Sequence, residues 1–255
     1  KNYKLCGLLM KRIEEVEKKF PNTNRKDIKI LDYGCGRGRS VAKLRDKGFD
    51  AYGVEIDHKV LSNGFQLFSN RNLIPQEILK PVEEINDFED SSFHLIFSEQ
   101  VFEHVSDLPK VIMELSRLTK IGGFGFHKFP GAFNFHEAHL NMPLVHWLPK
   151  NFLRKILIVF FLIIKKGPHN TWPEVKNTSL LEEADIYYRY MLNHTFYRKN
   201  IHISNLFNKF GFSATYKSRC KKNNWRRFIP SILLANGFPD GAIEFDVCRT
   251  KLLTK

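Results

Sequence analysis

Residues 28–38 read IKILDYGCGRG, an apolar β-like run that passes directly into a turn with glycine at positions 34, 36 and 38. Residues 40–47 then have the pattern of a helix, and Gly48 ends it. Glycine lets a backbone turn tightly and approach a bound ligand without a Cβ in the way. The stretch therefore predicts a strand, a ligand-binding turn and a helix, with a turn that binds nothing as the plainer alternative.

The spacing of the glycines separates the candidate ligands. The dinucleotide fingerprint Gly-x-Gly-x-x-Gly would need its third glycine at position 39, where this chain has Arg39. Seventeen residues after Gly38, Glu55 closes a second β-like run, where its carboxylate can accept hydrogen bonds from both hydroxyls of a ribose. A nucleoside without a pyrophosphate fits this pair of features best.

The alternation of β-like and helical runs continues along the chain and predicts an α/β fold, a Rossmann-like, doubly wound and mostly parallel sheet. Gly122 and Gly123 are expected to stop a helix before the next strand. The alternation breaks between residues 131 and 197. We therefore predict an α/β core made of residues 1–130 and 198–255, with 131–197 inserted as a helical, substrate-side subdomain. Strands are expected at 28–33, 51–56, 78–82, 93–98, 124–129, 212–219 and 242–249, and helices at 1–20, 40–47, 108–119 and 201–210.

Leu31–Gly38 resembles the hallmark of class I S-adenosylmethionine-dependent methyltransferases, a strand that ends Leu-Asp-x-Gly-Cys-Gly-x-Gly. Further resemblances follow in order at Glu55 and in segments 91–96, 100–105 and 120–123. The resemblance covers about residues 27–130 and extends to the last 55 residues by topology only. It implies a seven-stranded sheet, S-adenosyl-L-methionine as cofactor and S-adenosyl-L-homocysteine as product.

The resemblance also implies which residues hold the cofactor. The acid that reads adenine in such proteins stands in a Gly-Asp-Ala-Glu-like run, whereas this chain has Lys80-Pro81-Val82-Glu83-Glu84, so Glu83 becomes the candidate. The full set of cofactor-binding candidates is Asp32, Gly34, Cys35, Gly36, Gly38, Glu55, Ile56, Glu83, Ser98 and Gln100.

Methyl transfer to a hydroxyl needs a base, and histidine is the natural one near neutral pH. Five of the ten histidines lie between residues 104 and 146, and part of that stretch follows the strand at 124–129, where this architecture places substrates. The catalytic candidates are His104, His139 and His136, with Glu137 close behind. For each histidine the alternative is a structural hydrogen bond to the backbone.

A divalent metal is the less favoured alternative. Some similar methyltransferases hold an ion with Glu-x-x-Glu-His and a later histidine, whereas this chain has an amide, Gln100, before Glu103 and His104. An amide oxygen ligates a hard ion weakly.

The charge of the chain is unevenly distributed. Residues 1–137 hold 21 basic and 20 acidic residues, whereas residues 138–255 hold 19 and 7 and carry a net +12 of the total +13. Such a surface suits a phosphate-bearing partner. The phosphate-binding candidates are Arg198, Lys199, Arg219, Lys221, Lys222, Arg226 and Arg227.

The segment 129–149 resembles, more loosely, methyltransferases of bacterial surface-polysaccharide (capsule or O-antigen) clusters. That resemblance implies O-methylation of a sugar hydroxyl or phosphoryl-type group on a nucleotide- or lipid-linked glycan intermediate. One alternative acceptor is RNA, which Tyr216, Trp225 and Phe228 among basic residues suggest and the lack of a recognisable RNA-binding module opposes. The other alternative acceptor is a quinone-like small molecule. A binding module without activity is a third alternative, which the intact glycine turn and Glu55 disfavour.

The apolar run Ile156–Ile164 has nine residues, about half of the ~20 that a spanning helix needs. Lys and Arg flank it on both sides. It predicts either a helix packed on the sheet or in a homodimer, or a peripheral membrane contact through 152–166. The absence of a signal-peptide pattern and of a dense cysteine framework predicts a cytoplasmic protein, at the inner face of the membrane if the contact is made.

Overall fold

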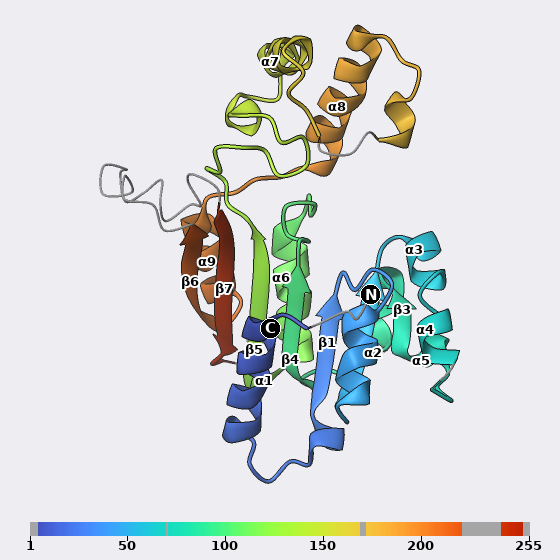
Figure 1. Cartoon of the computed structure of the whole chain (residues 1–255). Helices are drawn as coiled ribbons and strands as arrows, with labels where there is room; N and C mark the ends of the chain where they lie inside the picture. The colour runs from blue at the N-terminus through green and yellow to red at the C-terminus, as the bar shows by residue number, and fades with distance from the viewer. Residues whose placement is uncertain (1–4, 70, 169–171, 221–240, 252–255) are drawn as a thin grey trace.

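A computed structural model shows one seven-stranded sheet in the order β3-β2-β1-β4-β5-β7-β6 (Figure 1). The structure describes residues 5–69, 71–168, 172–220 and 241–251. Strands β1 to β5 pair in parallel, and β7 is antiparallel to both β5 and β6. The predicted doubly wound, mostly parallel α/β sheet is therefore confirmed. The strands are β1 (Lys29–Tyr33), β2 (Asp50–Glu55), β3 (Leu79–Pro81), β4 (Phe93–Glu99), β5 (Thr119–Pro130), β6 (Phe212–Cys220) and β7 (Gly241–Arg249).

Helices cover both faces of the sheet, and two apolar clusters form the core. One cluster includes residues of α1 and α2, and the other includes residues of α6 and α9. The adjacent β1 residues Ile30 and Leu31 belong to the first and the second cluster, respectively. Burial of both faces explains why the adjacent residues Ile30 and Leu31 of this strand are both apolar. The helices are α1 (Gly7–Lys19), α2 (Arg39–Asp46), α3 (His58–Ser62), α4 (Gln66–Ser69), α5 (Pro75–Ile78), α6 (Leu108–Leu118), α7 (Phe152–Ile163), α8 (Leu180–His194) and α9 (Asn200–Lys209), with 3-10 turns η1 (Arg25–Asp27), η2 (Val82–Asp87), η3 (Val145–Trp147) and η4 (Pro173–Val175).

Strand β5 differs from the expectation that Gly122 and Gly123 precede it. The strand begins at Thr119, directly after α6, and contains both glycines. Gly122 has a φ of +77°, and the register between β4 and β5 shifts near Phe93. The glycines therefore allow an irregularity within the strand instead of separating the strand from the helix.

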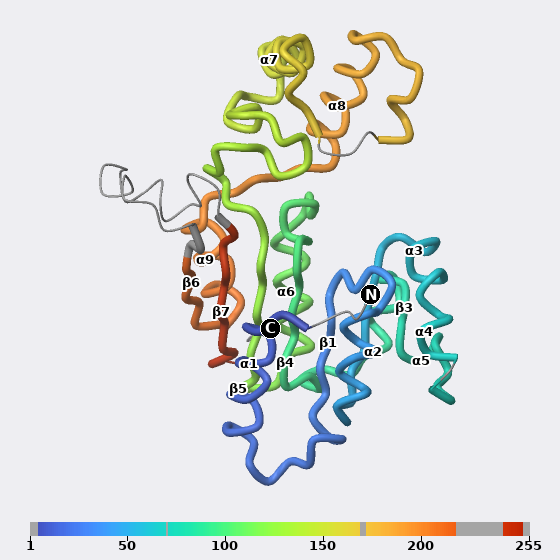
Figure 2. The backbone as a smooth tube through the Cα atoms, in the orientation of Figure 1, coloured from blue at the N-terminus to red at the C-terminus, as the bar shows by residue number. Residues whose placement is uncertain are grey.

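The segment between β5 and α9 lies beyond the carboxyl end of the parallel strands, and β5 runs straight into it (Figures 1 and 2). It holds α7, α8 and an apolar cluster whose members all lie between residues 140 and 197. This separate cluster supports the division into an insertion, 131–197, and a core, 1–130 with 198–255, which stays a prediction.

Helix α7 packs on α8 and does not lie on the sheet. Its buried residues Ile158 and Phe161 share the insertion's cluster with Tyr187 of α8. The opposite face of α7 is exposed and apolar. No helix within the described residues is long and apolar enough to span a membrane.

Candidate active site

The glycine turn is held against the end of β2. The backbone N–H groups of Gly34 and Cys35 both donate to the carbonyl of Val54 at 2.9 Å. Gly34, Gly36 and Gly38 have φ values of +79°, +55° and +70°, the region that favours glycine. A Cβ on Gly34 would lie 2.4 Å from Cγ2 of Val101. The glycines are therefore required both by the backbone conformation and, at Gly34, by close packing.

Glu55 ties this turn to the loop that follows β2. Its Oε2 accepts a hydrogen bond from the N–H of Gly36 at 2.8 Å, and its Oε1 accepts from Ile56 at 2.8 Å and Asp57 at 3.1 Å. The carboxylate is thus fixed at the carboxyl end of the strand, facing a cavity that it helps to line.

That cavity has a volume of about 430 Å³, within the range of small-molecule sites. Most of the lining is apolar, and carboxylates, an amide and an imidazole interrupt it. The lining residues are Tyr33, Gly34, Val54, Glu55, Ile56, Val82, Gln100, Val101, His104, Val105, Ser106, Asp107, Lys110 and Val111.

Four of the predicted cofactor residues line this cavity: Gly34, Glu55, Ile56 and Gln100. Gln100 has a φ of +59°, and its N–H donates to the carbonyl of Lys128 at 2.8 Å. This conformation turns the chain at the end of β4. Residues 100, 101 and 104–106 border the cavity from a turn, not from a helix.

Four other candidates lie in or beside the glycine turn without lining the cavity. Asp32 is buried at the end of β1, and burial together with Glu99 raises its pKa well above the usual value. Cys35 is buried as well, and burial raises the pKa of its thiol. The remaining two are Gly36 and Gly38, whose conformation shapes the turn.

Glu83 and Ser98 are not brought to the cavity. Glu83 is exposed in η2 with its carboxylate 3.4 Å from Nε2 of His58, and its neighbour Val82 takes the lining position. Ser98 is buried inside the sheet, where its hydroxyl lies 2.9 Å from Nδ1 of His127. η2 and β4 place both side chains away from this cavity, and their cofactor contacts stay a prediction.

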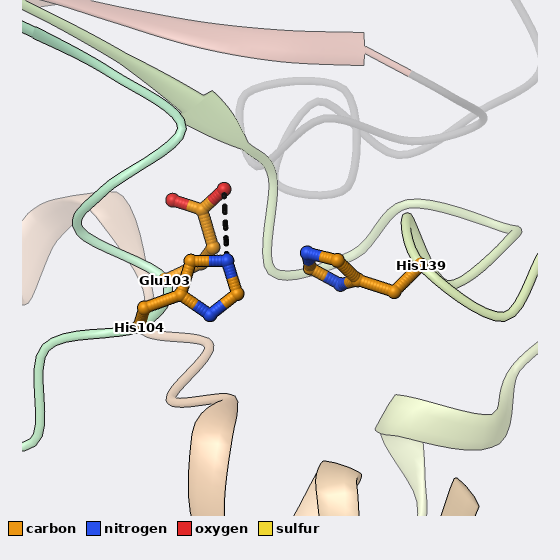
Figure 3. A group of neighbouring side chains, drawn as sticks. All are labelled: Glu103, His104 and His139. Atoms are coloured by element: carbon orange, nitrogen blue, oxygen red, sulfur yellow. Dashed lines mark ion pairs between the residues drawn. The ribbon is translucent and has the colours of Figure 1, made fainter. Parts of the chain in front are cut away.

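His104 and His139 come together from the core and the insertion (Figure 3). Their ring centroids lie 4.9 Å apart. His104 donates from Nδ1 to the carbonyl of His194 at 2.6 Å, and burial lowers its pKa. His139 donates from Nδ1 to Oε1 of Glu137 at 2.9 Å. Each ring is therefore held through Nδ1, so that in its neutral form Nε2 carries the lone pair.

Glu137 organises the loop that carries His139. Its buried carboxylate accepts hydrogen bonds from the N–H groups of His139 and Leu140 at 2.8 and 2.6 Å, and from the hydroxyl of Tyr197. Burial opposes ionisation, but these bonds and the His139 imidazole hold the pKa of Glu137 below its usual value. Burial also opposes the charge of His139, whose pKa the Glu137 carboxylate nevertheless raises.

Glu103 lies beside these histidines, and sequence reasoning did not count it among the catalytic residues. Its side chain is buried, and no described residue forms a hydrogen bond with either carboxylate oxygen. Oε1 lies 3.9 Å from Nε2 of His104, and burial raises the pKa of Glu103 to about 7. The Glu103-His104 pair was visible in the sequence, but the burial of the carboxylate was not.

His136 does not join this group. Among the described residues it forms an isolated β-bridge with Pro143, and its ring contacts that of Phe135 at 4.9 Å. It does not line the cofactor cavity. His104 and His139 therefore lie together while His136 lies apart, and the catalytic role of each stays a prediction.

The phosphate-binding candidates are only partly described. The Arg198 guanidinium donates to the carbonyls of Phe102, Val105, Ser106 and Phe196, which gives it a structural role. Lys199 is exposed before α9, and Arg219 lies in β6. Lys221, Lys222, Arg226 and Arg227 lie outside the described residues, as do Trp225 and Phe228.

The sheet order, the glycine turn and the acid at the end of β2 are those of the class I S-adenosylmethionine-dependent methyltransferase fold. Residues 31–126 match the family described as "Methyltransferase domain". S-adenosylmethionine is the methyl donor of this class.

Known proteins that resemble the chain are distant. It is 30% identical over 112 residues to tocopherol O-methyltransferase of Arabidopsis thaliana. The matched region covers 43% of this chain and 30% of that enzyme. It is also 30% identical over 102 residues to ubiquinone biosynthesis O-methyltransferase of Pelagibacter ubique. That match covers 40% of this chain and 41% of the enzyme. The matches therefore span less than half the length of these two relatives.

A solved structure confirms the fold. Phosphoethanolamine N-methyltransferase 2 of Haemonchus contortus, in complex with S-adenosyl-L-methionine, superposes with a TM-score of 0.54 at 12% identity, covering 95% of this chain and 53% of that one.

Proposed function

We propose that this chain transfers a methyl group from S-adenosylmethionine to a hydroxyl oxygen of a small molecule. The observation that carries the proposal is the meeting of His104 and His139, because His104 also lines the cavity that Glu55 borders. In this proposal Gly34, Glu55, Ile56 and Gln100 contact the cofactor, and the acceptor binds between the cavity and the insertion.

The proposed step is an in-line displacement. The acceptor oxygen attacks the methyl carbon, the carbon–sulfur bond breaks, and S-adenosylhomocysteine leaves with the electron pair on sulfur. His139 takes the hydroxyl proton at Nε2, since its Nδ1–H is already held by Glu137. Most of the rate enhancement would come from holding the two reactants in line, which can supply up to ~7–11 kcal/mol.

The narrower proposal for the acceptor is a phosphate-bearing glycan intermediate, nucleotide- or lipid-linked. The net +12 of residues 138–255 supports it. The structural role of Arg198 leaves the phosphate to the other basic residues. A quinone-like or phenolic acceptor is the second candidate, favoured by the names of the tocopherol and ubiquinone relatives.

One experiment tests the reaction and the acceptor together. Purified protein is incubated with S-adenosylmethionine and, separately, with sugar nucleotides, phosphorylated glycan precursors and catechol-type phenols, and products are detected by mass spectrometry. The glycan proposal expects a gain of one methylene unit and release of S-adenosylhomocysteine only with the phosphate-bearing sugars. Methylation of the phenols alone would reject it in favour of the second candidate, and RNA binding that falls steeply with salt would favour an RNA acceptor.

We also propose that the exposed face of α7 contacts an anionic membrane surface. Four of its apolar side chains, Phe152, Ile156, Phe160 and Ile163, are between 52% and 67% exposed. Lys165 and Lys166 follow the helix directly and are exposed, which complements anionic lipid. Contact with a second copy of the chain is the competing explanation for this face.

A further inference from the structure

We propose that Glu103, His104 and His139 form a binding site for a divalent transition-metal ion, and that zinc is the ion it fits best. Each residue offers one ligand atom, and the three atoms lie within 4.8 Å of one another. Figure 3 shows the imidazole of His139 directed toward the Glu103 and His104 side chains, which come from one turn. Two imidazoles and one carboxylate are a ligand set found in catalytic zinc sites.

The two imidazoles are already oriented for an ion. A histidine that binds a metal through one ring nitrogen usually donates the N–H of the other to a carboxylate or a backbone carbonyl. His139 donates from Nδ1 to Glu137, and His104 donates from Nδ1 to the carbonyl of His194. In the neutral form of each ring Nε2 therefore carries the lone pair, and it is free of these two hydrogen bonds.

The carboxylate supplies an independent observation. Glu103 is 2% exposed, yet no described residue donates a hydrogen bond to either of its oxygens. A buried carboxylate without a partner is costly, and a cation beside it removes that cost. Apart from the 3.9 Å contact with His104, a divalent ion bound to Oε1 would give this carboxylate the close partner that no described hydrogen-bond donor supplies.

The geometry needs only small side-chain adjustments. Ligand atoms about 2.0–2.2 Å from a zinc ion lie about 3.3–3.6 Å apart in a tetrahedral site. Oε1 of Glu103 is 3.9 Å from Nε2 of His104, so this pair is close to that spacing. Three protein ligands leave a fourth position open to water or to an acceptor oxygen, as in catalytic zinc sites.

The open position would serve the proposed methyl transfer, and the link depends on that proposed function. His104 lines the cofactor cavity, so the ion would stand at its edge. A divalent ion lowers the pKa of a bound hydroxyl. In the metal-bound protein, His104 and His139 are ligands, and the ion takes over the task of making the acceptor oxygen nucleophilic.

The test measures binding of the metal itself. The full chain is stripped with a chelator, re-equilibrated with Zn²⁺ or Co²⁺, and analysed by calorimetry, by elemental analysis after gel filtration and, for Co²⁺, by visible absorption. One equivalent is expected. His104→Ala and His139→Ala should each weaken binding by more than the ~10- to 100-fold cost of losing an outer-shell partner. His202→Ala, at an exposed position of α9, is the control and should leave binding unchanged.

Glu103→Gln separates ligation from folding. It keeps the size of the side chain and removes the buried charge, so the variant should fold and bind Zn²⁺ more weakly than the unsubstituted chain. Unchanged Zn²⁺ affinity in Glu103→Gln and in both alanine variants would overturn the proposal, as would no binding by the unsubstituted chain. S-adenosylmethionine affinity is measured on the same metal-free samples. Cofactor binding without zinc binding would reject the metal site alone, whereas loss of cofactor binding would reject the proposed function.

Discussion

Replacing Glu137 with alanine should destabilise the protein through the insertion. Its carboxylate accepts hydrogen bonds from two backbone N–H groups, from Nδ1 of His139 and from the hydroxyl of Tyr197. Hydrogen bonds to a charged group contribute about 1.5–3 kcal/mol each and are not additive. Removing one partner of a buried charged pair costs about 3–5 kcal/mol, and we expect a loss of that size. It is a large fraction of the 5–15 kcal/mol that stabilises a typical protein.

Urea denaturation followed by tryptophan fluorescence measures this loss. Trp147 reports on the same segment, since its indole N–H donates to the carbonyl of Asn134 at 2.9 Å. Glu174→Ala, an exposed carboxylate of the insertion, is the control and should stay within about 0.5 kcal/mol of the unsubstituted chain. A loss below about 1 kcal/mol for Glu137→Ala would refute the view that this carboxylate organises the loop.

Three further predictions concern the cofactor turn and α7. Glu55→Ala should weaken S-adenosylmethionine binding by about 100-fold or more in calorimetry, because the two proposed hydrogen bonds from the ribose hydroxyls to this carboxylate are lost. An affinity within a few-fold of the original would contradict the ribose assignment. Gly34→Ala should lower the thermal midpoint in scanning calorimetry, since its φ is +79° and the new Cβ would meet Val101; an unchanged midpoint would show that the turn can rearrange. Phe160→Asp should abolish sedimentation with anionic vesicles at low salt, and concentration-dependent dimerisation without vesicle binding would favour a second copy instead.

The parts of the site that follow from local sequence were predictable. The strand, the glycines and Glu55 lie within 28 residues, and their backbone conformations depend on short-range chemistry. Gly34, Glu55 and Gln100 line one cavity, and their contacts with the cofactor stay a prediction. Glu83 was not predictable in the same way, because the direction of its side chain depends on the 3-10 turn η2, which sequence periodicity does not reveal.

The meeting of distant segments was only partly predictable. His104 and His139 are both histidines that follow strands, so their types and approximate places could be selected. Their 4.9 Å separation depends on how the insertion returns over the sheet, and no spacing rule contains that information. Arg198 was selected for phosphate binding by its charge, and its sequence position did not reveal that its guanidinium donates to backbone carbonyls.

The segment 194–198, where the chain returns from the insertion to the core, holds the turn 100–106 in place. The N–H of Phe196 donates to the carbonyl of Glu103 at 2.6 Å, and the carbonyl of His194 accepts from His104. Arg198 adds hydrogen bonds to the carbonyls of Val105 and Ser106 on the far side of the same turn. The core therefore supplies the residues of the turn, while the insertion fixes their orientation. The same segment carries Tyr197, whose hydroxyl donates to Glu137, the partner of His139. One segment therefore orients both histidines. The alignment of the two imidazoles depends on how the insertion packs on the core.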